Sequence, residues 1–86
     1  LALGQRHLEV LVLADDDQTV RNLLTMHAER GGFTVRSGEN GAEALELVTE
    51  NTDVVLLDLQ MPVLDGFGAL ERLGREHPGV PAVVLT

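Results

Sequence analysis

The sequence contains no cysteine, no lysine and no tyrosine, and it has no long hydrophobic run. The lack of cysteine excludes disulfide bonds and thiolate metal sites. The apolar runs fall well short of the roughly 18 residues that a membrane span requires, so we expect no transmembrane helix. The N-terminus also lacks the charged-then-apolar pattern of a signal peptide, and we therefore expect a cytoplasmic protein.

Basic residues are scarce. The chain has six basic residues, all arginine, and 14 acidic residues, so its formal net charge is −8 at pH 7. A nucleic-acid surface needs clustered Lys and Arg, so this balance argues against direct nucleic-acid binding. The 86 residues suffice for one domain, and 44% hydrophobic residues with interspersed charges are typical of a globular chain. We therefore treat residues 1–86 as a single domain.

Short apolar runs alternate along the chain with segments of helical periodicity. We expect four strands, over Leu8–Ala14, Phe33–Arg36, Asp53–Leu59 and Ala82–Thr86. We expect three helices, over Gln18–Arg30, Ala42–Glu50 and Phe67–Glu76. This alternation predicts an α/β fold with a parallel sheet and right-handed crossovers. The second strand alternates apolar and polar residues, which indicates a sheet edge.

Each expected helix has an apolar stripe and recognisable end signals. The stripes are Val20, Leu23, Leu24, His27 and Ala28 in the first helix, Ala44, Leu45 and Val48 in the second, and Phe67, Leu70 and Leu73 in the third. Asp17 is expected to cap the first helix, and Asn40 or Ser37 the second. Gly31 and Gly32 are expected to end the first helix, since glycine adopts the left-handed conformation at low cost.

Three acidic residues stand at the ends of two apolar runs. Asp15 and Asp16 follow Val10–Ala14, and Asp58 follows Val54–Leu57. Such short, Val-rich runs are typical of strands buried on both faces of a parallel sheet. Ligands bind such sheets at the carboxyl ends of strands where the strand order reverses. The pattern therefore places three carboxylates at the edge of the sheet where such a fold binds its ligands, with loop solvation, capping or turn formation as the structural alternative.

Three segments together resemble the receiver domain of two-component response regulators. They are LVLADDD at 11–17, LLDLQMPVLDG at 56–66 and PAVVLT at 81–86, and the resemblance extends from about Leu8 to Thr86. It implies a flavodoxin-like, doubly wound parallel sheet with strand order 2-1-3-4. In that order the first and third strands are neighbours, which would bring Asp15 and Asp16 beside Asp58.

The resemblance also implies roles for individual residues. It makes Asp58 the phosphoacceptor. It makes Asp15, Asp16, Asp58 and the backbone carbonyl of Gln60 the Mg²⁺ ligands, with Asp15 acting mainly through water. Thr86 matches the hydroxyl residue that contacts the phosphoryl group.

By the same resemblance, the chain takes its phosphoryl group from a histidine kinase or phosphotransfer protein of a phosphorelay and switches an output domain or effector protein. It would assist its own phosphoryl transfer and dephosphorylation rather than act as an enzyme. The family's fourth helix, its fifth strand with a lysine and its fifth helix have no counterpart here. We therefore expect an incomplete receiver domain, whose apolar last strand needs a further strand or a partner beside it.

Two other functions fit parts of the pattern. The chain could act only through its surfaces, for instance as a dimer or strand-swapped dimer formed through the fourth strand. It could also be a Mg²⁺-dependent phosphohydrolase with an aspartyl nucleophile. Such enzymes usually place an Asp that acts as a general acid two residues after the nucleophile, where this chain has Gln60, which counts against this alternative. A hydrolase turns over, whereas a receiver retains the phosphoryl group.

Overall fold

The computed structural model describes residues 9–58, 61 and 64–85. Strands and helices alternate in the order β1 (Glu9–Ala14), α1 (Gln18–Arg30), β2 (Phe33–Gly38), α2 (Gly41–Leu47), β3 (Thr52–Asp58), α3 (Gly66–Glu76) and β4 (Ala82–Leu85). The expected four strands and three helices are therefore confirmed. None of the described helices is long and apolar enough to cross a membrane.

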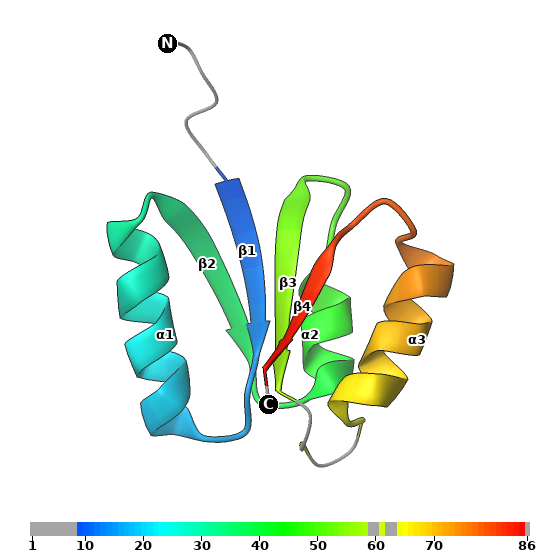
Figure 1. Cartoon of the computed structure of the whole chain (residues 1–86), viewed down its shortest axis with the longest axis horizontal. Helices are drawn as coiled ribbons and strands as arrows, with labels where there is room; N and C mark the ends of the chain where they lie inside the picture. Colours follow the sequence, from blue (N-terminus) through cyan, green and yellow to red (C-terminus); the bar gives the residue numbers. More distant parts are fainter. Residues whose placement is uncertain (1–8, 59–60, 62–63, 86) are drawn as a thin grey trace, which may run out of the picture.

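All four strands are parallel and form one sheet in the order β2-β1-β3-β4 (Figure 1). This is the predicted order, with β2 at an edge. In the register of the two central strands, Val12 pairs with Val55 and Ala14 with Leu57. The order reverses between β1 and β3, so their carboxyl ends form the switch point at which open α/β sheets bind ligands.

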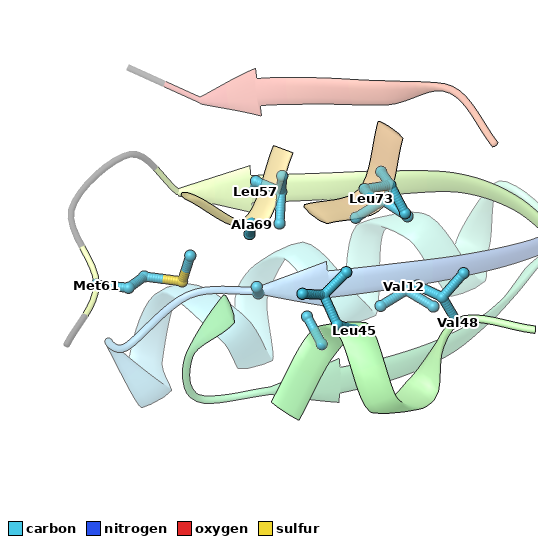
Figure 2. Close-up of a cluster of buried hydrophobic side chains, with 10 residues drawn as sticks. Val12, Leu45, Val48, Leu57, Met61, Ala69 and Leu73 are labelled. Atoms are coloured by element: carbon cyan, nitrogen blue, oxygen red, sulfur yellow. The ribbon is translucent and has the colours of Figure 1, made fainter. Parts of the chain in front are cut away.

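The core lies between the sheet and the helices α2 and α3 (Figure 2). Side chains alternate across a strand, so every second residue of β1 and β3 faces this layer. The strand residues of the core are Val12, Ala14, Val55 and Leu57, and the helical ones include Ala44, Leu45, Ala69 and Leu73. Burying an aliphatic side chain contributes about 1.5–3 kcal/mol, so this layer holds the central strands firmly side by side.

The helix α1 covers the other face of the sheet, and its orientation differs from the prediction. Its bounds are as expected, but none of its 13 residues is buried. The residues that turn inward are Val20, Leu24 and Ala28, spaced by four, together with Arg21 and Thr25. Leu23 and His27, both assigned to the inward stripe, are exposed. The apolar stripe is wide enough to face the sheet in two rotations of α1 about its axis. The packing of α1 on β1 and β2 selects the rotation in which Arg21, not Leu23, faces inward.

Burial on this face decreases across the sheet from β1 to β4. Leu13 of β1 pairs with Leu56 of β3, which pairs with Val83 of β4. Leu13 is buried, Leu56 is half-buried and Val83 is 48% exposed. The reason is that α1 packs over β1 and β2, and no helix among the described residues lies over β4 on this side.

The inward face of α3 also differs from the prediction. Leu73 is buried as expected, but Phe67 is 67% exposed and Leu70 is also exposed. The buried row is instead Ala69 and Leu73, four residues apart. A small residue is needed there because α2 and α3 pack closely, and Ala69 lies against Gly41 at the start of α2.

The remaining differences lie at element ends. The helix α2 begins one residue earlier than predicted and ends at Leu47 rather than Glu50, because the backbone is already extended at Val48. The Thr49 N–H donates to the Thr52 hydroxyl and the Thr52 N–H to the Thr49 carbonyl, forming a turn that starts β3 early. Asn40, not Ser37, caps α2. The strand β2 runs on to Gly38, while the predicted ends at Leu8, Leu59 and Thr86 lie outside the described residues.

Candidate functional site

Three carboxylates meet at the carboxyl ends of β1 and β3. Asp15 directly follows β1, Asp16 is the next residue, and Asp58 is the last residue of β3. One carboxylate oxygen of each lies within 4.8 Å of the others. Asp15 is buried, Asp58 is half-buried and Asp16 is exposed, so the cluster opens from the sheet edge toward solvent. The register that pairs Ala14 with Leu57 produces this proximity, because the residues that follow the pair are Asp15 and Asp58.

Asp15 lies in the turn between β1 and α1 and is held there by hydrogen bonds within the turn itself, with β2 and with α1. Its carboxylate Oδ1 accepts from the N–H of Asp17 at 2.9 Å. Its own N–H donates to the carbonyl of Gly38 at 3.3 Å. Its carbonyl oxygen accepts from Nη1 of Arg21 at 2.8 Å. A residue that is only 5% exposed and fixed at three atoms presents its carboxylate in one direction.

Helix caps fix the segments on either side of the cluster. Asp17 caps α1 as predicted, with its Oδ1 accepting from the N–H groups of Thr19 at 2.8 Å and Val20 at 3.2 Å. Asp65 caps α3 in the same way through the N–H of Gly68 at 2.8 Å. Met61, in the loop that follows β3, is buried in the core (Figure 2).

The electrostatics of the cluster favour a bound cation. Burial raises the pKa of Asp15 above its ordinary value of 3.8, while the hydrogen bond from the Asp17 N–H opposes this rise. The negative charges of Asp58, Asp16 and Asp17 raise the pKa of Asp15 further. These neighbouring negative charges disfavour the ionised form of Asp15, and a positive ion bound among the carboxylates would relieve this repulsion.

The donor set fits a hard divalent ion. All three side chains offer carboxylate oxygens, one of them is buried, and they converge within the reach of a single ion. Mg²⁺ in proteins is held by one or two carboxylates together with water and phosphate oxygens. Asp15, Asp16 and Asp58 therefore meet the requirements of a magnesium site.

The structure brings together three of the five side chains or groups that the sequence assigned to the site. Asp15, Asp16 and Asp58 cluster as predicted. The Gln60 carbonyl and the Thr86 hydroxyl lie outside the described residues, so their roles remain predictions. Sequence reasoning missed Arg21, which contacts the Asp15 carbonyl. Its position one turn into a capped helix beside an acidic turn was the available signal.

Comparison with known proteins identifies the family of the chain. The sequence profile of the response regulator receiver domain matches residues 11–86. The transcriptional regulatory protein SrrA of Staphylococcus aureus is 40% identical over 77 residues, which are 88% of this chain and 32% of SrrA. The chain thus spans about a third of the length of that relative.

Solved structures give the same result. A response regulator receiver domain protein from Clostridium thermocellum has a TM-score of 0.85 at 27% identity, over 91% of this chain and 64% of that one. The non-phosphorylated HemR receiver domain from Leptospira biflexa has a TM-score of 0.83 at 28% identity, with the same coverage. On its sequence, its strand order and its carboxylate cluster, the chain belongs to the family of response regulator receiver domains.

Proposed function

We propose that this receiver domain accepts a phosphoryl group on Asp58, in a reaction that depends on Mg²⁺. The observation that carries the proposal is the position of Asp58 at the end of β3, with oxygens of Asp15 and Asp16 within 4.8 Å. Phosphoryl transfer asks a protein mainly for positioning and for charge neutralisation. An acidic cluster built around one half-buried carboxylate supplies the nucleophile and the ligands of the neutralising ion.

The transfer itself is a nucleophilic displacement. A carboxylate oxygen of Asp58 attacks the phosphorus of the donor, and the bond between phosphorus and the donor atom breaks. The electron pair of that bond leaves with the donor, and Asp58 becomes an acyl phosphate. Asp15 and Asp16 would hold Mg²⁺ together with Asp58 and, as the family resemblance implies, the Gln60 carbonyl. Bound Mg²⁺ would offset the negative charges of the carboxylate and phosphoryl oxygens.

Receiver domains of response regulators interact with histidine kinases and with output domains. For this chain we propose a histidine kinase or phosphotransfer protein as the donor, in the cytoplasm, and an output domain or effector protein as the target. The acyl phosphate is retained, and the chain assists its transfer and hydrolysis without acting as a multiple-turnover enzyme. Leu85 of β4 pairs with Asp58 in register, so the end of β4 lies beside the phosphorylation site. The predicted contact of Thr86 with the phosphoryl group would start the switch there.

The test is the intact mass of the protein after incubation with MgCl₂ and a small acyl phosphate donor. We expect the addition of one phosphoryl group, and none in the Asp58→Asn variant or when the metal is chelated. Asp65→Asn serves as a matched control, because Asp65 is an exposed carboxylate outside the cluster and its cap of α3 survives as Asn. A folded wild-type protein that gains no mass would refute the proposal, and release of phosphate over many turnovers would favour a hydrolase.

One observation favours a second candidate, a module that acts by association. Val83 of β4 is 48% exposed on a part of the sheet that no described helix covers, and Leu23 and Met26 of α1 are exposed as well. Exposed apolar strands at a sheet edge tend to pair with other chains. Sedimentation of the unphosphorylated protein over a range of concentrations distinguishes the two. This second function is supported if the wild type and Asp58→Asn form dimers equally well and the wild type gains no phosphoryl group.

A further inference from the structure

Arg21 holds the acidic turn from outside the carboxylate cluster. It lies one turn into α1, and its side chain is only 13% exposed, although α1 has no buried residue. Nη1 donates to the carbonyl oxygen of Asp15 at 2.8 Å, and Nη2 lies 4.0 Å from Oε1 of Glu39. A guanidinium group is broad and planar, so one nitrogen can donate to the Asp15 carbonyl while another lies within ion-pair distance of the Glu39 carboxylate.

These contacts tie together three parts of the fold that meet at the site. Asp15 is in the turn after β1, Arg21 is in α1, and Glu39 is in the loop after β2. The carbonyl of Gly38, the residue before this loop, also accepts the N–H of Asp15. The Asp15 carbonyl belongs to the peptide group that joins Asp15 to Asp16. Fixing it therefore fixes the direction in which the exposed Asp16 leaves the turn.

We propose that Arg21 is a positioning residue for divalent-cation binding: it orients the Asp15–Asp16 peptide so that both carboxylates converge with Asp58. The inference rests on the proposed function insofar as the ion is the one used in phosphoryl transfer. Groups that orient ligands without touching the ion change metal affinity by about 10–100-fold when they are removed. We expect Arg21 to act in this way.

The charge of Arg21 makes the proposal easy to distinguish from a purely electrostatic role. A guanidinium near the site repels a divalent cation, so its removal by itself would tighten Mg²⁺ binding. Loss of positioning would weaken binding. A role in folding alone would lower the melting temperature and leave the affinity of the folded protein unchanged. The three roles therefore predict three different results for the same variant.

The experiment is a calorimetric titration of the whole 86-residue chain with MgCl₂, for wild type, Arg21→Ala and Arg21→Lys. We expect Arg21→Ala to weaken Mg²⁺ binding at least about tenfold. Arg21→Lys keeps the charge and one donor but loses the fork, so its affinity should lie between the other two. Arg30→Ala is the matched control, since it removes the same charge from the exposed last turn of α1 and should leave the affinity unchanged.

The results separate this inference from the proposed function. Binding by Arg21→Ala that equals or exceeds that of wild type overturns the inference, even if the wild type is phosphorylated. If Arg21→Ala does not fold, an affinity of Arg21→Lys equal to that of wild type overturns it. A wild type whose Mg²⁺ affinity depends on Arg21 as expected, but which gains no phosphoryl group, overturns the proposed function alone. A folded wild type that binds no Mg²⁺ overturns both.

Discussion

At the scale of single residues, Asp15 is the most constrained group in the site. It is buried, it is hydrogen-bonded through its carboxylate, N–H and carbonyl, and it has three other carboxylates nearby. Its raised pKa means that the folded protein binds the Asp15 proton more tightly than the unfolded chain does. In the metal-free protein, ionised Asp15 is therefore a source of instability, which a bound cation would remove.

The raised pKa of Asp15 leads to a prediction for the variant Asp15→Asn. The contribution of Asp15 to stability is greatest below its unfolded pKa of 3.8 and is lost as the pH rises through its raised folded pKa. Asn carries no charge and can still accept the Asp17 N–H. We therefore expect Asp15→Asn to raise the melting temperature of the metal-free protein at pH 7, by an amount that shrinks toward pH 4.

Thermal melts of both proteins in the presence of a chelator, from about pH 4 to about pH 7, check this expectation. The same variant should gain less stability from MgCl₂ than the wild type. A lower melting temperature for Asp15→Asn at pH 7 would show that hydrogen bonding of the carboxylate outweighs its burial and the repulsion from its neighbours.

At the scale of elements, the close packing of α2 and α3 depends on Gly41. Its N–H donates to the Leu64 carbonyl at 3.0 Å, and a Cβ at this position would run into that carbonyl oxygen. The same Cβ would lie 3.0 Å from the Cβ of Ala69 in α3. The start of α2 and the segment before α3 can therefore meet only through a residue without a side chain.

We predict that Gly41→Ala destabilises the protein by about 1–3 kcal/mol, the usual cost of overpacking a fixed core. Gly74→Ala is the matched control. Gly74 lies in α3, and a methyl group there would point into space that the described residues leave open, so alanine should stabilise the helix by about 0.5–1 kcal/mol. Urea unfolding of the two variants measures the change in the free energy of unfolding that each substitution causes. Two changes of the same sign would contradict the packing described for α2 and α3.

At the scale of the whole molecule, the charge of −8 and the carboxylate cluster act together. Excess negative charge disfavours the compact state by self-repulsion, and any salt reduces this effect. Only an ion bound at a specific site stabilises the folded protein beyond this general screening of charge. Free Mg²⁺ at about ten times its Kd would add about 1.4 kcal/mol, which is several degrees in the melting temperature of a domain of this size.

We therefore expect MgCl₂ to raise the melting temperature more than NaCl does at the same ionic strength. The extra increase should largely disappear in Asp16→Asn, which removes one ligand from the exposed side of the cluster. It should persist in Glu71→Gln, which removes the same charge from an exposed position on α3. Equal melting temperatures of the wild type in the two salts would argue against a specific ion site.

Much of the fold and of the site could be predicted because it depends on short patterns. The apolar run before Asp15 and the one before Asp58 specify buried strands, and a parallel sheet then brings their ends together. Asp17 is followed by a helical pattern, and its cap was predictable from the chemistry of one side chain. The family motifs lie in these same segments, so local pattern and family resemblance agreed on the three carboxylates, and the resemblance supplied the strand order.

The sequence by itself determined which segments form strands and helices, and which acids stand at the switch point. Only the tertiary structure decided how the helices are rotated. It turned Arg21 inward and His27 outward, and it buried Ala69 in place of Phe67. The reason is that an amphipathic stripe allows several rotations of similar local energy. Contacts between segments far apart in the chain, such as Arg21 with Glu39 and Ala69 with Gly41, select one of them.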